Sequence, residues 1–187
     1  MKKRNSVLLV LLSVAGASIF ALTRGESPET NIPPVLTEEP VIANPAAPNP
    51  CAYTWAYQDL PEISAEFNAD VQALVPEAEA RATAFGEDCV SADGRAVSFA
   101  EMETDFYVII QVSDLNDNEA LGTLIEKILP ILDGFTSPRV PGAKEGFVEF
   151  TFQNSEEQRV IRVPIPLGRA LRERGLHGAE LIGAIEQ

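Results

Sequence analysis

The chain has 187 residues and a formal net charge of −14, with 14 Lys and Arg against 28 Asp and Glu. A chain this acidic lacks the cationic surface that phosphate-rich partners require, so we expect no nucleic-acid binding. The chain has one His and two Cys, so few side chains are available for imidazole-based or thiol-based catalysis.

The first 23 residues predict an export signal or a membrane anchor. Lys2, Lys3 and Arg4 precede an uncharged, largely apolar run from residue 6 to residue 23. As a helix this run would reach about 27 Å, close to the thickness of a hydrocarbon core. Ala15-Gly16-Ala17 also offers the small residues that a signal peptidase reads, so an uncleaved anchor and a cleaved signal both stay open. In either case the basic end stays inside, and the protein is expected to be extracytoplasmic, membrane-anchored or secreted.

Residues 24–50 predict a Pro-rich extracytoplasmic linker. Seven of the 14 prolines lie between residues 27 and 50, and proline favours extended geometry over helix or sheet interiors. Residues 51–187 remain, which suffice for one globular domain with its own core. This domain carries 10 basic and 24 acidic residues, so it holds the whole net charge.

Cys51 and Cys89 predict a disulfide, because two cysteines in an exported domain most simply pair with each other. Tyr53, Trp55 and Tyr57 follow Cys51 at a spacing of two, so in a strand they share one face. We expect this aromatic face to be core packed beside the disulfide. A platform on which sugars stack is the alternative.

A helix is predicted to start at Asp59-Leu60-Pro61-Glu62, which combines a capping Asp, an early Pro and a Glu. Apolar residues recur behind it at steps of three and four as far as Phe85, and Gly86 ends the pattern. Pro76 predicts a kink or a break between two abutting helices. The apolar stripe consists of Ile63, Phe67, Val71, Leu74, Ala78, Ala82 and Phe85.

The rest of the domain predicts two pairs of strands around a second helix. Asp93-Gly94 predicts a turn before a short strand at 96–100 and a longer strand at 104–112. Leu121, Leu124, Ile125, Ile128, Leu132 and Phe135 mark the amphipathic helix. Residues 146–153 and 158–165 predict a hairpin, and 167–174 and 179–185 predict short terminal helices.

The predicted order is therefore helix, strand, strand, helix, strand, strand, helix. This order predicts a single α+β domain over residues 51–187, with a mainly antiparallel sheet of about four strands and helices on one face.

One loop, Asp114-Leu115-Asn116-Asp117-Asn118-Glu119, resembles the DxNDN calcium linker between cadherin repeats. The resemblance covers six or seven residues and implies a calcium site. Asp114, Asn116 and Asn118 fit the first three ligand positions of an EF-hand loop, although Glu119 and Ile125 do not fit the later ones, and these three residues are the candidate ligands. The loop also fits a helix cap, with Asn116 as the capping residue and Glu119 three positions later. Both interpretations can hold together, and calcium is the only cofactor that the sequence indicates.

Acidic and basic side chains are distributed unevenly along the domain. Glu101, Glu103 and Asp105 alternate on the expected solvent face of a strand, where carboxylates could act as acid and base or simply face water. The last 29 residues hold five basic and three acidic residues. The basic residues are Arg159, Arg162, Arg169, Arg172 and Arg174. Pairing with the acidic body is the expected role, and a patch that binds an anion or a partner is the alternative.

The chain shows no Gly-x-Ser-x-Gly turn and no Gly-rich phosphate loop, so we expect that the protein is not an enzyme. The leading hypothesis is a non-catalytic binding or sensing domain, tethered to the membrane by its N-terminal segment, with a protein or small-ligand partner. A calcium-dependent adhesion or structural module is the first alternative. A carboxylate-based hydrolase is the second.

Overall fold

The computed structural model describes residues 51–187, so the predicted anchor (1–23) and linker (24–50) lie outside the described part of the chain. The strands are β1 (Ala52–Asp59), β2 (Glu79–Val90), β3 (Ala96–Gln111), β4 (Lys144–Gln153) and β5 (Gln158–Pro164). The helices are α1 (Pro61–Leu74), α2 (Asn118–Ile128), the 3-10 helix η1 (Leu129–Gly134), α3 (Ile165–Glu173) and α4 (Gly178–Ile185). None of these helices is long and apolar enough to span a membrane.

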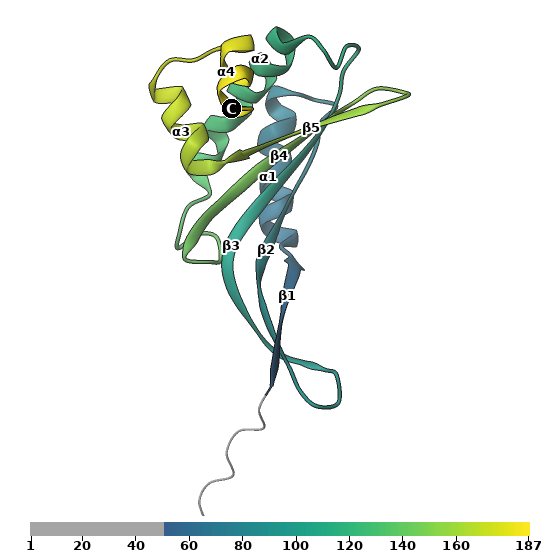
Figure 1. The fold of residues 1–187 in the computed structure, drawn as a ribbon, viewed down its shortest axis with the longest axis vertical. Coiled ribbons are helices and arrows are strands. Elements are labelled where there is room, and N and C mark those ends of the chain that lie inside the picture. Colours follow the sequence, from purple (N-terminus) through teal and green to yellow (C-terminus); the bar gives the residue numbers. More distant parts are fainter. Residues whose placement is uncertain (1–50) are drawn as a thin grey trace, which may run out of the picture. The chain divides into compact units, whose positions relative to one another are not determined.

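The strands form one sheet whose spatial order is the same as their order in the sequence (Figure 1). Neighbouring strands are antiparallel except β3 and β4, which are parallel. The α+β class is confirmed, but the sheet has five strands and is mixed rather than mainly antiparallel with about four. The parallel pair arises because α2 and η1 form a long crossover that returns the chain to the end of the sheet where β3 began.

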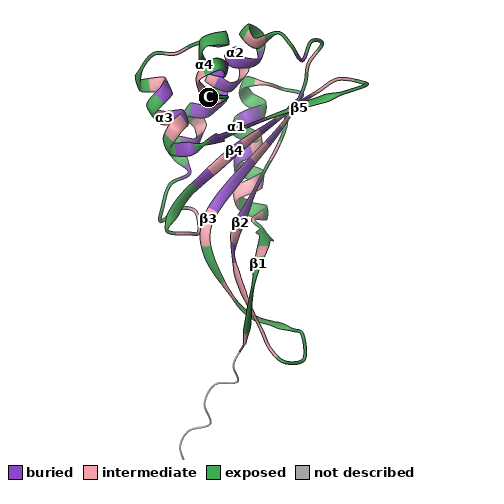
Figure 2. Cartoon of the chain, viewed as in Figure 1, coloured by how far each residue is buried: buried purple, intermediate pink, exposed green. Residues whose placement is uncertain are grey.

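One hydrophobic core joins a single face of the sheet to the helices (Figure 2). The sheet contributes Ala82, Phe106, Val108, Ile110, Val148, Phe150, Phe152, Ile161 and Val163. The helices contribute Phe67, Val71, Leu121, Ile125, Ile128, Leu171, Leu181 and Ile182, among others. All these strand residues share one side of the pleat, since residues paired across neighbouring strands point the same way. The opposite side, called here the open face, carries no core residue within residues 51–187.

The first helix ends earlier than the sequence predicted. The apolar stripe suggested helical structure as far as Phe85, whereas α1 ends at Leu74 and a strand begins at Glu79. Pro76 lies between the two elements and cannot donate an amide hydrogen bond to continue the helix. The backbone of β2 bonds to the side of α1 instead, with the Ala82 amide donating to Ser64 Oγ at 2.9 Å.

The structure also differs from the sequence prediction of two separate strands at 96–100 and 104–112. Residues 96–100 and 104–111 belong to one long strand, β3, which runs through the acidic residues between them and ends one residue before the predicted boundary. The predicted hairpin is confirmed as β4 and β5, and Asn154 caps its turn by accepting from the Glu156 and Glu157 amides. The second helix is confirmed as α2 followed by η1, and the terminal helices as α3 and α4.

A three-stranded ribbon extends beyond the helices at one end of the sheet (Figure 1). It consists of β1, residues 83–90 of β2 and the first half of β3. Gly86 lets β2 and β3 approach closely, because a side chain there would collide with the Ala100 carbonyl oxygen. The predicted disulfide is confirmed: Cys51 and Cys89 are bonded, with their Cα atoms 5.3 Å apart. This bond indicates a secreted or extracytoplasmic location.

Candidate functional site

The aromatic residues of β1 lie on the surface, so the prediction that they form core is wrong. Tyr53 is 69% exposed, Trp55 60% and Tyr57 59%. The spacing of two correctly predicted that the three residues share one face of β1. That face belongs to the open face of the ribbon, which the helices do not cover. Three large rings exposed in a row are unusual on a protein surface, so this row is a candidate binding region.

Phe85 of β2 completes this cluster. It lies directly opposite Tyr57 in the register and packs between two rings of β1. Its ring centroid is 5.4 Å from that of Trp55, with the rings stacked, and 5.0 Å from that of Tyr57. Tyr53, Trp55, Tyr57 and Phe85 are called the aromatic stripe below. Since the strand rises about 3.4 Å per residue, successive rings of β1 lie roughly 7 Å apart.

Carboxylates border the aromatic stripe. Glu87 lies opposite Trp55, and Glu103 lies opposite Phe85. These side chains are partly buried, and they give the surroundings of the stripe a negative potential. An anionic ligand is therefore disfavoured on this surface, whereas an uncharged or amine-bearing ligand is compatible with it.

Asp105 lies on the open face next to the stripe, but it does not face water as the sequence predicted. It is 1% exposed, and the Phe147 amide donates to its Oδ1 at 3.2 Å. Thr83 lies directly opposite and is 4% exposed. Within residues 51–187, Asp105 Oδ2 and Thr83 Oγ1 have no hydrogen-bond partner. Burial raises the pKa of Asp105 to about 6, although the Phe147 amide acts in the opposite direction.

The open face continues past Asp105 as a set of aromatic rings covered by guanidinium groups. Arg81 lies 4.0 Å from the Tyr107 ring centroid, and Arg162 lies 4.2 Å from that of Phe147. The two rings meet edge to face at 5.8 Å. Arginine therefore covers these rings, whereas the three rings of β1 stay exposed.

The basic residues near the C-terminus pair with acidic residues of the body. Arg159 bonds to Glu186 at 2.7 Å, Arg162 contacts Glu149, and Arg169 bonds to Glu145 at 2.9 Å. Arg172 bonds to Asp133 at 2.9 Å, in an open hollow of about 520 Å³ that Arg169 also lines. Arg159 and Arg162 point to opposite faces of β5, so the five arginines form no single patch. Arg174 lies exposed on the surface.

The acidic loop caps α2, but through a different residue from the one predicted. Asp117, not Asn116, is the cap: its Oδ1 accepts from the Ala120 amide at 3.0 Å. Asp114 Oδ1 accepts from the Asn116 amide at 2.8 Å. Asn118 Oδ1 accepts from Arg159 at 2.7 Å, which places a positive charge where a calcium ligand was predicted. Calcium binding at this loop stays a prediction.

The remaining titratable side chains of residues 51–187 do not come together in one site. Residues 51–187 contain no group of three or more His, Cys, Asp or Glu side chains that could hold a metal ion. Of the predicted carboxylates, Glu101 is exposed while Asp105 is buried. His177 lies at the surface with its Nδ1 2.7 Å from Glu126 Oε1.

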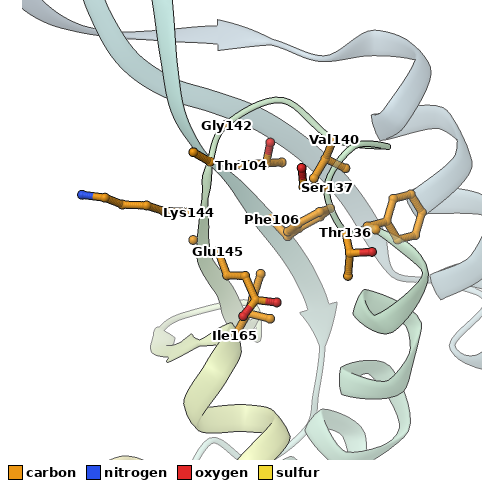
Figure 3. Close-up of a pocket in the computed structure, with 12 residues that line it drawn as sticks. Thr104, Phe106, Thr136, Ser137, Val140, Gly142, Lys144, Glu145 and Ile165 are labelled. Carbon is orange, nitrogen blue, oxygen red and sulfur yellow. The ribbon is translucent and has the colours of Figure 1, made fainter.

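Figure 3 shows a small pocket on the helical side, beneath the loop that leads into β4. Thr104, Phe106, Val140 and Ile165 line it, and Thr104 Oγ1 donates to the Pro141 carbonyl at 2.7 Å. Its volume of about 50 Å³ leaves room for little more than a water molecule. The aromatic stripe is therefore the stronger candidate for a binding site.

Comparisons with protein-family models, with curated proteins and with solved structures found no match to this chain. The aromatic stripe combines residues that the sequence analysis did not connect. The alternation in β1 was visible, but Phe85 was assigned to a helix. An assignment of residues 79–90 to a strand would have found it.

Proposed function

We propose that residues 51–187 form a non-catalytic, extracytoplasmic binding domain that the N-terminal segment tethers to the membrane, and that its ligand is a sugar chain. The observation that carries this proposal is the exposure of Tyr53, Trp55 and Tyr57 in one row of β1. The disulfide supports an extracytoplasmic location, and the predicted anchor at 1–23 supports the tether.

The chemistry of the aromatic stripe favours a carbohydrate. The C–H faces of sugar rings pack on aromatic faces, while their hydroxyl groups bond to polar groups at the border. Glu87 and Glu103 offer such acceptors beside Trp55 and Phe85. Their charge disfavours uronic-acid or sulfated chains, so the expected ligand is a neutral or amine-bearing oligosaccharide.

The two alternative functions have less support in the geometry. A calcium-dependent module would need Asn118 to exchange Arg159 for a metal ion. A hydrolase would need two carboxylates facing a common cleft, whereas Asp105 is buried under its neighbours and Glu101 is exposed on the ribbon.

Trp55 makes the proposal directly testable, because it is the only Trp in the chain. Its fluorescence should change on titration with neutral oligosaccharides, such as chains of glucose or N-acetylglucosamine, and the change should saturate. Tyr57→Ala should weaken the binding by roughly two- to tenfold, since a stacked ring commonly contributes about 0.5–1.5 kcal/mol. The matched control is Val160→Ala, an exposed apolar residue of β5 at the other edge of the sheet.

Two results would contradict the proposal. One is a fluorescence signal that stays flat with every neutral and amine-bearing chain. The other is equal affinity in Tyr57→Ala and Val160→Ala, which would place the ligand away from the aromatic stripe.

A further inference from the structure

We propose that β1 pairs with β1 of a second copy of this chain, so that two sheets join into one across a two-fold axis at Trp55. This inference concerns the edge of the sheet, not its open face, and does not depend on sugar binding. β1 ends the sheet order, and within residues 51–187 its outer edge pairs with no other strand. Seven of its eight residues are exposed, so a second strand can approach it.

The two edges of the sheet differ in how they are protected. Proteins commonly discourage pairing at an edge strand with proline and with charged side chains. β5 has Pro164 at its end and carries Arg159 and Arg162. β1 has no charge and no proline from residue 52 to residue 58. An unprotected edge of this length is a template for another strand.

The sequence of β1 fits its own antiparallel copy. When Trp55 lies opposite Trp55 of the second copy, Tyr53 lies opposite Tyr57 and Tyr57 opposite Tyr53, which gives three pairs of rings. Centring the pair on Thr54 or on Ala56 gives only two pairs of rings. Residues opposite each other in an antiparallel pair lie on the same face, so all six rings stay on the joined open face. This near-palindrome is what a two-fold interface requires, since such an interface is self-complementary.

The carboxylates nearest the two-fold axis lie too far apart to oppose this pairing. Glu87 is the carboxylate nearest the axis in the register, since it lies opposite Trp55 on β2. In the joined sheet the two copies of Glu87 are separated by three strand spacings, about 14 Å. That distance exceeds the screening length of roughly 8 Å at physiological ionic strength.

Cysteine cross-linking of the full chain in its membrane tests the register. Trp55→Cys places each new thiol opposite its own copy, with Cα atoms about 4.5–5.5 Å apart, a distance that a disulfide spans. Tyr57→Cys is the matched control on the same strand and face, because the two new thiols would lie about 14 Å apart. Under mild oxidation we expect the covalent dimer of Trp55→Cys to exceed that of Tyr57→Cys by at least about tenfold.

A mixture of Thr54→Cys and Ala56→Cys tests the same register without removing Trp55, because these positions lie opposite each other across the axis. The mixture should cross-link more than either variant alone. Equal cross-linking of Trp55→Cys and Tyr57→Cys would overturn the proposal, since it would indicate random collisions. Monomer in both the Trp55→Cys sample and the mixture would overturn it too, provided that mass spectrometry finds the Cys51–Cys89 bond intact.

Discussion

Asp105 shows how one buried carboxyl can make the stability of this domain depend on pH. Its side chain is 1% exposed, and one amide bond to Oδ1 does not replace the water that it lost. Burial raises its pKa to about 6 in the folded protein, compared with an ordinary value of 3.8 for an aspartic acid in water. The folded protein therefore holds this proton more tightly than the unfolded chain does.

The sign of the pH dependence follows from this difference. Below about pH 3 both states are protonated. Between about pH 4 and pH 6 only the folded state keeps the proton, so the folded state loses stability over this range, by about 3 kcal/mol in total. Asp105→Asn keeps an acceptor for the Phe147 amide and removes the charge. We expect the variant to gain about 3 kcal/mol relative to the wild type between pH 3 and pH 7.5, measured by urea unfolding at a series of pH values.

Glu101→Gln is the control for this experiment, because Glu101 is exposed on the same strand. It should change the free energy of unfolding by no more than about 0.5 kcal/mol at any of these pH values. Parallel pH profiles for Asp105→Asn and the wild type would show that Asp105 titrates normally.

The cap of α2 gives a second prediction at the level of a single residue. Asp117 accepts from the Ala120 amide, one of the free donors at the helix start. Asp117→Ala should lower the free energy of unfolding by about 1 kcal/mol, as measured by chemical denaturation. Asn116→Ala should cost no more than about 0.5 kcal/mol, because the Asn116 side chain is not the cap. A reversed order of the two costs would restore Asn116 as the capping residue.

Among the elements, β1 is attached to the sheet by its pairing with β2 and by the disulfide. It contributes exposed rings and no residue to the core, and it holds to the sheet through its pairing with β2. The Cys51–Cys89 bond closes a sequence separation of 38 residues. The double variant Cys51→Ala and Cys89→Ala should lose about 4 kcal/mol of stability in the chain-entropy model, measured by thermal or chemical unfolding. Unchanged stability would mean that β1 stays in place through its hydrogen bonds alone.

Local sequence patterns predicted most helices and strands correctly. They failed where the same residues fitted both the helical spacing of three and four and the strand spacing of two. Steps of three and four from Ile63 to Phe85 suggested a long helix, yet Ala80, Ala82 and Ala84 also alternate as a strand requires. Alanine fits both periods, so only tertiary contacts with β3 decide between them. The burial of the β1 rings was predicted wrongly for a related reason. Alternation in β1 shows which rings share a face, but it does not show whether helices cover that face.

At the scale of the whole molecule, sequence patterns could not predict the direction in which β4 runs relative to β3. The hairpin of β4 and β5 was predicted from its two strands and its turn. Its parallel attachment to β3 depends on the path of α2 and η1 across the sheet, which local periodicity does not encode. The number of strands was underestimated because β1 and β2 were assigned to an isolated aromatic segment and to a helix.

The location of the whole chain gives a prediction that concerns the N-terminal segment. We expect the intact protein in the membrane fraction after an alkaline wash, and we expect protease added from outside to digest residues 51–187. This follows from a basic start and an apolar run of membrane length. Release of the exported domain into the medium would instead indicate a cleaved signal. Full-length protein in the cytosol would contradict the extracytoplasmic function.

The position of the disulfide also decides how the domain would respond to mechanical load. A force that arrives through residue 50 enters the domain at Cys51, the end of an edge strand. Without the disulfide, only the hydrogen bonds between β1 and β2 would carry such a force from β1 into the rest of the sheet. The bond to Cys89 passes the load directly to β2, which is paired on both sides. Tension applied at Cys51 would then pass to β2 while the rings of β1 keep their places.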